Sequence, residues 1–173
     1  MKTLHLIRHA KSSWAESFLS DAERPLNARG HKACRLMAQP ILNEGCSFEN
    51  VFCSTAQRAQ STIEGIADSL PQLNIQWELD QNLYTFSSRD LLRWVRVLSD
   101  GLNDVVIIGH NPGLTDFCNE MGDRHIMNVP TCAYAQLEFP TESWKSIGPE
   151  SAKTVSFITP KLVKSIQTPG AET

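Results

Sequence analysis

The chain has 173 residues, of which 41% are hydrophobic and 20% are charged, and these values predict one globular domain with its own core. The formal net charge of -3 argues against sequence-independent binding to nucleic acid, which requires an excess of basic residues. No apolar run approaches the ~20 residues that cross a bilayer. No segment near Met1 resembles a signal peptide, so we expect a cytoplasmic protein without a membrane partner.

The cysteines do not form a disulfide framework or a zinc site. Their number is odd, and no two have the C-x-x-C spacing. We therefore expect reduced thiols that are mostly buried. The five residues are Cys34, Cys46, Cys53, Cys118 and Cys132.

Strand-like apolar runs alternate with helical patterns through the first half of the chain. Residues 3–7 predict a strand. Asn27 is a candidate N-cap for a helix that stops near Gly45, and Pro40 is expected to kink or shorten this helix. A short strand at 51–53 then precedes an amphipathic helix that starts after Ser54. A further strand is expected at 75–79.

The same alternation continues through the second half. Ser88 is a candidate N-cap for the next helix, and the run DVVIIG predicts a strand that is buried on both faces. Asn111 and Pro112 are expected at the N-cap and first position of a following helix. Residues 133–139 and 154–158 read as strands. We expect one domain over residues 1–165 and a flexible tail over residues 166–173.

This order of elements predicts an α/β fold, a three-layer α/β/α sandwich with a mostly parallel central sheet. In such sheets ligands bind beyond the carboxyl ends of the strands. Three predicted strand ends carry reactive or charged side chains, in the segments IRH, STAQR and GHNP. The fold would bring these distant segments to one edge of the sheet, which is therefore the expected site.

The residue types at this edge suit a phosphoryl group. Arg8 and Arg58 can each present two N–H donors to phosphoryl oxygens, and amide groups at the start of the helix after Ser54 would add partial positive charge. A neutral imidazole has a free lone pair at neutral pH, so either His9 or His110 could attack phosphorus. The other histidine would donate a hydrogen bond to the phosphoryl oxygens.

Each of these features also has a purely structural interpretation. An Arg-His pair at a strand end is usually a solvated turn, and His110 could simply bond a neighbouring carbonyl group. The positive charge of Arg58 is unfavourable near a helix start, where the helix dipole is also positive. An anion bound beside Arg58 would explain this placement. The remaining histidines lack such neighbours and are expected to be structural or surface residues: His5, His31 and His125.

Four ordered segments resemble one known family. LIRHAKSSW resembles the R-H-G signature of the histidine phosphatase superfamily, the phosphoglycerate-mutase-like proteins. DAERPLNARG, STAQRAQST and VVIIGHNPGL resemble three further segments of its SixA-type phosphohistidine phosphatases. The resemblance spans the chain from Leu4 to Leu114. It implies the phosphoglycerate-mutase-like fold, no metal or organic cofactor, and His9 as the nucleophile that becomes phosphorylated, with Arg8, Arg58 and His110 completing the phosphate pocket.

Further residues are carried over from the same motifs as substrate contacts. Ser12 occupies a position where the mutases use a serine near the phosphate. Arg24 is expected either at the pocket mouth or in a salt bridge with Asp21. Ala10 replaces the glycine of the R-H-G signature, as it does in other SixA-type members, and we expect this change to be tolerated.

One departure bears on the substrate. Near LDQNLYTFSS the mutases and many phosphomonoesterases place a glutamate general acid, whereas Thr85 follows LY here and Glu78 and Asp80 lie upstream. Asp80 or Asp116 could still fold into reach. An alkoxide leaves poorly without a proton donor, while the imidazole of a phosphohistidine needs far less help.

The expected partner is therefore a phosphorylated protein carrying phosphohistidine, or else a small phosphoester. A mutase, or a non-catalytic phosphate-binding regulatory module, could use the same pocket. Oligomeric state is not predicted from these features.

Overall fold

A computed structural model of the protein, in which residues 1–167 are described, contains one mixed sheet with the strand order β3-β2-β4-β1-β5-β6. Four strands run parallel, β1 (Lys2–Arg8), β2 (Val51–Ser54), β3 (Trp77–Asp80) and β4 (Asp104–Gly109). β5 (Tyr134–Phe139) is antiparallel to β1, and β6 (Lys153–Ile158) is antiparallel to β5. The predicted α/β fold with a mostly parallel sheet is confirmed.

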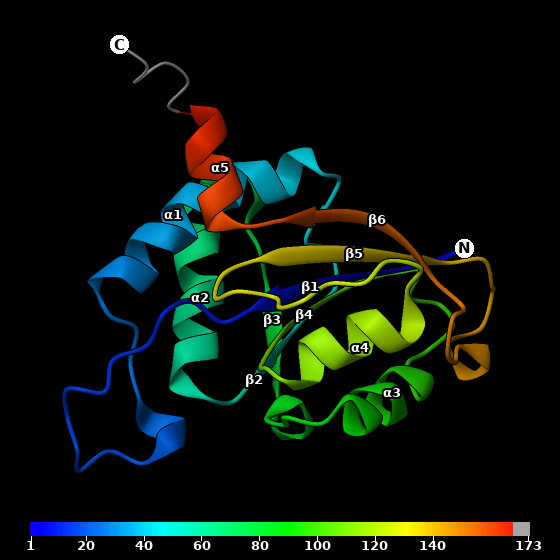
Figure 1. Ribbon diagram of the computed structural model, residues 1–173, viewed down its shortest axis with the longest axis horizontal. Helices are drawn as coiled ribbons and strands as arrows, with labels where there is room; N and C mark the ends of the chain where they lie inside the picture. The colour runs from blue at the N-terminus through cyan, green and yellow to red at the C-terminus, as the bar shows by residue number, and fades with distance from the viewer. Residues whose placement is uncertain (168–173) are drawn as a thin grey trace.

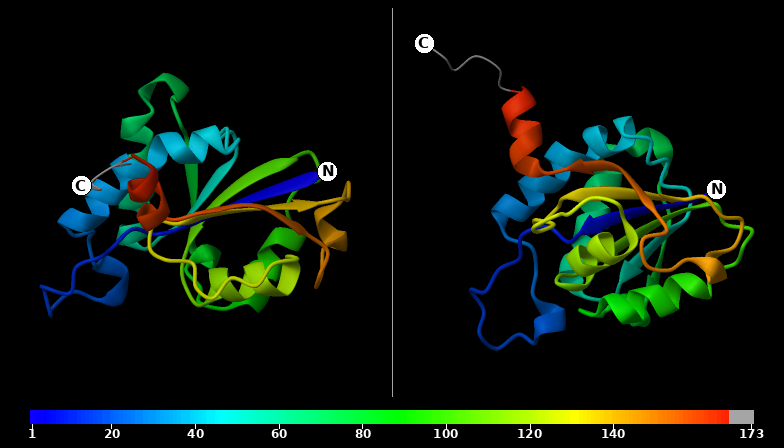
Figure 2. Two further views of the ribbon diagram at one scale, coloured as in Figure 1. Left: turned by 45° about the horizontal axis from the view of Figure 1, so that its top comes forward. Right: turned by 45° about the vertical axis from the view of Figure 1, so that its right-hand side comes forward.

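Helices cover both faces of this sheet (Figures 1 and 2). One face packs against α1 (Ala28–Asn43), α2 (Gln57–Ser69) and α5 (Pro160–Gln167), and the other against α3 (Ser88–Arg96) and α4 (Gly113–Met121). Successive residues of β4 alternate between the two cores: Val105 and Ile107 face α3 and α4, whereas Val106 and Ile108 face α1 and α2. Burial on both faces explains why this strand reads as an uninterrupted apolar run.

Helix α1 begins as predicted and ends near Gly45 as predicted. Asn27 is its N-cap, and the Asn27 side chain accepts a hydrogen bond from the Gly30 N–H at 2.9 Å. The helix continues through Pro40 to Asn43, so the prediction that Pro40 shortens it is wrong. Pro40 lies in the last turn, where the missing N–H costs a single hydrogen bond. Gly45 follows with a φ of 104°, a conformation that glycine adopts without strain.

The starts of α3 and α4 each differ from prediction by one residue. Ser87, not Ser88, is the N-cap of α3, because Ser87 has extended backbone and its hydroxyl accepts from the Asp90 N–H at 3.4 Å. Pro112, not Asn111, is the N-cap of α4. The Asn111 side chain nevertheless accepts from the Thr115 N–H at 3.1 Å and so caps the helix from one position earlier.

Other elements lie outside the predicted set. Helix α5 was not predicted, and it includes residues 166 and 167 of the expected tail, while residues 168–173 lie outside the described part. The strand expected at 75–79 begins at Trp77. Short 3₁₀ turns also occur, at Asp21–Glu23, Pro71–Leu73, Gln81–Leu83 and Trp144–Ser146.

All five cysteines are free thiols and buried, as expected. Within residues 1–167 we find no helix with the length and apolarity that crossing a membrane requires.

Candidate active site

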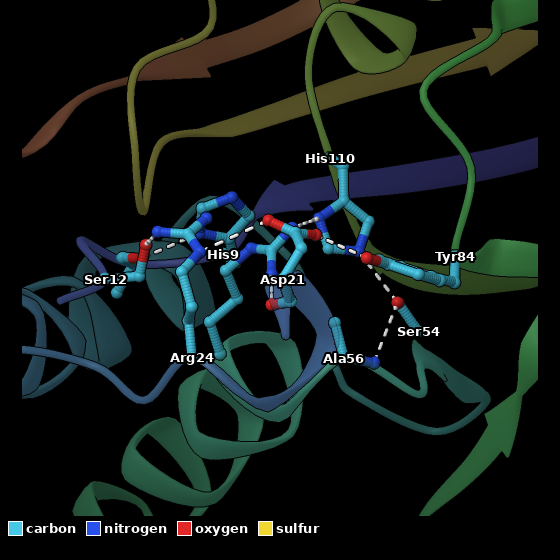
Figure 3. Close-up of polar contacts among 10 residues, drawn as sticks. His9, Ser12, Asp21, Arg24, Ser54, Ala56, Tyr84 and His110 are labelled. Carbon is cyan, nitrogen blue, oxygen red and sulfur yellow. Dashed lines mark hydrogen bonds and ion pairs between the residues drawn. The ribbon is translucent and has the colours of Figure 1, made fainter. Parts of the chain in front are cut away.

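The carboxyl ends of β1, β2 and β4 bring the three predicted segments together (Figure 3). His9 lies one residue past β1, and its side chain is 7% exposed. Its backbone N–H bonds the Gly109 carbonyl at 3.1 Å, which ties this residue to the end of β4. The His9 Nδ1–H donates to the Ala10 carbonyl at 2.7 Å, so the proton of the neutral ring is on Nδ1. Nε2 therefore keeps its lone pair, and none of the residues from 1 to 167 hydrogen-bonds it.

The surroundings keep His9 unprotonated. Burial, together with the positive charges of Arg58, Arg8 and Arg24, lowers the pKa of His9 to about 4, against the opposing effect of the hydrogen bond to the Ala10 carbonyl. The ring is thus neutral at physiological pH, in the form that a nucleophile requires.

His110 faces His9 across the site, with ring centroids 5.2 Å apart. It follows β4 and is 1% exposed. The Arg58 Nη2–H donates to His110 Nδ1 at 3.3 Å, so the ring proton is on Nε2, which donates to the Ser54 hydroxyl oxygen at 2.7 Å. Burial, then the charges of His9 and Arg58, lower the pKa of His110 to about 3.

Two guanidinium groups, from the buried Arg58 and the half-buried Arg8, face this histidine pair. Arg58 lies in the first turn of α2 and is 2% exposed, and Arg8 ends β1, where its Nη1 donates to the Val129 carbonyl at 3.0 Å. Burial, and then the charge of Arg58, lower the pKa of Arg8, which shows that the two cations repel each other. The Nε atoms of both arginines are buried without a hydrogen-bond partner among residues 1–167. Unpaired donors on two adjacent cations form an arrangement that an oxyanion would stabilise.

Asp21 lies at the centre of the polar network in Figure 3. It accepts from Arg58 twice, through its backbone carbonyl at 2.7 Å and through Oδ2 at 3.0 Å, and the Tyr84 hydroxyl donates to the same Oδ2 atom. Partial burial acts to raise the pKa of Asp21, but the hydrogen bonds from Tyr84 and Arg58 and the charge of Arg58 outweigh it and lower the pKa to about 2. Asp21 is therefore ionised at neutral pH and does not supply a proton.

Ser12 and Arg24 lie beside this network and contact each other. Arg24 Nη1 donates to the Ser12 hydroxyl at 2.7 Å, and Arg24 Nε pairs with Asp21 Oδ1 at 3.2 Å, so the predicted salt bridge is present. The Arg24 guanidinium also stacks on the exposed Trp14 ring, 3.6 Å from its centroid. The charge of Arg24 contributes to the lowered pKa of His9, which places this arginine at the edge of the same site.

Ala10 fits where the family signature has glycine. It is fully buried, and its N–H donates to the Thr62 hydroxyl at 2.8 Å. The Thr62 hydroxyl in turn donates to the Arg58 carbonyl at 2.7 Å, which links the segment that contains His9 to α2.

Sequence reasoning missed Tyr84, Ser54 as a histidine partner, and the central position of Asp21. The only signal for Asp21 was its place in the DAERPLNARG segment. Tyr84 had no signal, because its contact with Asp21 depends on how residues 81–84 turn after β3.

The upstream carboxylates do not reach the histidines. Asp80 accepts from the Trp94 indole N–H at 2.8 Å and from the Asn82 N–H at 2.8 Å, so both of its oxygens are engaged there. Asp116 is the remaining candidate for a general acid, and it lines a cavity of about 410 Å³ together with Arg8.

In residues 1–167 no three His, Cys, Asp or Glu side chains are grouped as metal ligands. His5 bonds Tyr134 at 2.7 Å and Asp104 at 3.0 Å in the interior, the structural role expected of it.

Comparison with known proteins agrees with this architecture. The model of the histidine phosphatase superfamily (branch 1) matches residues 4–87. The protein histidine phosphatase SixA, solved in complex with tungstate, aligns with a TM-score of 0.75 over 92% of this chain and 97% of its own, at 22% identity. A mycobacterial glucosyl-3-phosphoglycerate phosphatase aligns with a TM-score of 0.62 over 92% and 98% of the two chains, at 11% identity.

The segment that matches the superfamily model contains Arg8, His9 and Arg58, and the likeness to the solved structures shows that the chain shares their fold. The uncharacterized protein ML1117 of Mycobacterium leprae is 26% identical over 90% of this chain and all of its own length. A 2,3-bisphosphoglycerate-dependent phosphoglycerate mutase of Mesorhizobium japonicum is 31% identical over 47% of this chain and 41% of its own. The match to the superfamily model supports phosphatase activity.

Proposed function

We propose that the protein is a cofactor-independent phosphatase that hydrolyses a phosphoryl group through a covalent phosphohistidine intermediate on His9, and that its substrate is phosphohistidine in a protein. One observation carries the proposal: an unprotonated, unpartnered Nε2 of His9 lies beside two arginines whose buried Nε donors are unpaired among residues 1–167. A nucleophile and preorganised donors are the two components that phosphoryl transfer requires.

In the first step, His9 Nε2 attacks phosphorus and the bond from phosphorus to the leaving group breaks. Arg8 and Arg58 would hold the equatorial oxygens, and the Nε donors would gain the partners that they lack within the described chain. A bound phosphoryl dianion next to His110 would favour a second proton on its Nδ1, which would change this atom from an acceptor for Arg58 into a donor to the phosphoryl group.

In the second step, water attacks the phosphorus of the phosphorylated His9. The bond between phosphorus and Nε2 breaks, the lone pair returns to the ring, and the water proton leaves with the phosphate product or passes to solvent. The hydrogen bond from Nδ1–H to the Ala10 carbonyl holds the ring in one orientation through both steps.

The preference for phosphohistidine rests on the leaving group. The carboxylate nearest the nucleophile network is Asp21, and it is ionised and occupied by Arg24 and Arg58. An imidazole that carries a proton leaves phosphorus as a neutral molecule, so it needs no donor from the enzyme. Small phosphomonoesters are the second candidate, favoured by Asp116, which lines a cavity with Arg8 and could protonate an alkoxide.

A comparison of three substrates tests the proposal: an aryl phosphate, a phosphohistidine peptide and an alkyl phosphate. The wild type should hydrolyse the first two, and His9→Ala should abolish both activities while the fold is retained. His125→Ala, which removes an exposed histidine, is the control and should match the wild type. Full activity of His9→Ala would refute the nucleophile assignment, and absence of all wild-type hydrolysis would favour a non-catalytic phosphate-binding module.

The arginines are tested in the same assay. Arg58→Ala should slow hydrolysis by about 10²- to 10³-fold, as expected for loss of a preorganised donor. A rate within about twofold of the wild type would remove Arg58 from the site. Reaction with a ³²P-labelled substrate followed by an alkaline quench, in which phosphohistidine is stable, and loss of the protein-bound label in acid would identify the phosphohistidine intermediate directly.

A further inference from the structure

A basic cleft opens beside the candidate active site, between the loop that follows β1 and the helices α1 and α5. Its volume is about 250 Å³, and its charged lining residues are Lys11, Arg29, Lys32 and Lys164, with no acidic residue in the lining that residues 1–167 provide. Helices α1 and α5 lie next to each other here (Figure 1). We propose that this basic cleft binds acidic side chains of the phosphoprotein substrate, and this inference rests on the function proposed above.

Three of the four cations of the basic cleft, Lys11, Arg29 and Lys32, are available to a partner. All four are exposed, and Lys11, Arg29 and Lys32 form no ion pair with any residue from 1 to 167. Arg29 and Lys32 also lie at the N-terminal end of α1, whose first turn contains no acidic residue. Positive side chains are unfavourable at this positive end of the helix dipole, and a bound carboxylate would relieve the repulsion.

The basic cleft is joined to the catalytic segment through the backbone. Lys11 is two residues from His9, and its carbonyl accepts from the Asn27 N–H at 3.0 Å. On the other side, Thr131 lines the cleft and precedes Cys132, whose N–H bonds the carbonyls of Arg8 and His9 at 3.0 and 3.1 Å. A protein segment with its phosphohistidine at His9 therefore has the basic cleft as its immediate neighbour.

Acidic side chains suit this surface better than a second phosphate group. A phosphate site needs convergent donors that are held rigidly, such as the buried Nε groups of Arg8 and Arg58. The cations of the basic cleft are instead exposed and carried on separate elements, which suits several carboxylates spread over a protein surface. The chain has 19 acidic and 16 basic residues, so this local excess of positive charge would also orient an acidic partner.

Two synthetic peptides provide the test. Each carries one phosphohistidine, flanked by glutamates in one peptide and by glutamines in the other, and hydrolysis is measured at low and at moderate salt. The enzymes are the wild type, Arg29→Gln/Lys32→Gln, Arg29→Glu/Lys32→Glu, and Lys145→Gln as a matched control. Lys145 is an exposed lysine in the 3₁₀ turn Trp144–Ser146, remote from the basic cleft. An aryl phosphate, which carries no acidic side chain for the cleft to bind, reports on the chemistry alone.

For the wild type and Lys145→Gln, kcat/KM should be about three- to tenfold higher with the glutamate peptide than with the glutamine peptide. The difference should lie in KM, and it should become smaller as the salt concentration rises. The preference should disappear in the double glutamine variant and reverse in the double glutamate variant, while aryl phosphate hydrolysis stays unchanged. Equal kcat/KM for both peptides in the wild type, or a preference that survives in both double variants, would overturn the inference. Failure of the wild type to hydrolyse either peptide while it hydrolyses the aryl phosphate would instead refute the proposed phosphohistidine substrate.

Discussion

The two site histidines should make the protein sensitive to acid. Both are buried in the neutral form, with pKa values lowered to about 4 for His9 and about 3 for His110. In the unfolded chain both pKa values return to ~6.5. Between these values the unfolded state binds protons that the native state does not, so the free energy of unfolding falls as the pH falls. The stabilisation is complete above about pH 6.5 and is lost progressively toward the native pKa values.

The size of the effect follows from the same pKa values. Between pH 7 and pH 5, each histidine should cost about 2 kcal/mol of the free energy of unfolding, or roughly 4 kcal/mol for the pair. Because both native pKa values lie below 5, this loss depends almost entirely on the unfolded-state pKa and hardly on the exact native one. Asp21 adds little in this range, since its native pKa of about 2 matters only near and below the ordinary carboxyl pKa.

Urea unfolding at pH 7 and at pH 5, in buffer without phosphate, measures the loss. The wild type and His110→Gln are compared, and His125→Gln serves as a control that removes an exposed histidine. The loss between the two pH values should be about 2 kcal/mol smaller in His110→Gln than in the wild type, and unchanged in His125→Gln. The comparison of slopes does not depend on how far each substitution changes stability at pH 7. An identical pH dependence in wild type and His110→Gln would show that His110 is not buried in its neutral form.

Three further substitutions test neighbouring parts of the structure. Asp21→Asn should lower the inhibition constant for inorganic phosphate several-fold, because it removes the negative charge that pairs with Arg24 and Arg58. Steady-state inhibition by phosphate measures this constant, and an unchanged value would contradict the prediction. Gly30→Ala should destabilise the fold by about 1–3 kcal/mol in urea unfolding, because the new Cβ would lie 2.2 Å from the Lys11 carbonyl oxygen, and a variant as stable as wild type would disprove this close contact. Asp116→Asn should hydrolyse phosphohistidine at a rate within about twofold of the wild type, because that leaving group needs no acid. A rate about tenfold lower would instead assign proton donation to Asp116.

The framework of the site was predictable because it depends on strand ends. Arg8, His9 and His110 lie at the ends of two strands whose apolar runs are unambiguous, and parallel pairing of β1 with β4 places them side by side. Arg58 follows β2 by four residues, in the first turn of α2. The alternation of elements and the direction of the strands were sufficient for this part.

The contacts among these residues were not predictable in the same way. Tyr84 reaches Asp21 only because a 3₁₀ turn follows β3, and Asp21 itself comes from a long loop whose course no periodicity describes. The true N-caps, Ser87 and Pro112, each have a neighbour that is itself a good capping residue, so only the backbone dihedrals distinguish them. Helix α5 was missed because its burial rests chiefly on Val163, packed against the core beneath α1 and α2.

The position of Asp21 suggests how the pocket balances capture of phosphate against its release. Without a ligand, the carboxylate of Asp21 pairs with Arg24 and Arg58, which keeps Arg58 oriented while its Nε donor has no partner among residues 1–167. A phosphoryl group would thus meet a guanidinium that is already positioned but only partly neutralised, so little reorganisation is needed on binding. The same negative charge also weakens the hold on the phosphate product, because the arginine charges are shared between the two anions. Asp21 would then act as a positioning residue that also limits product inhibition, although its carboxylate transfers no proton.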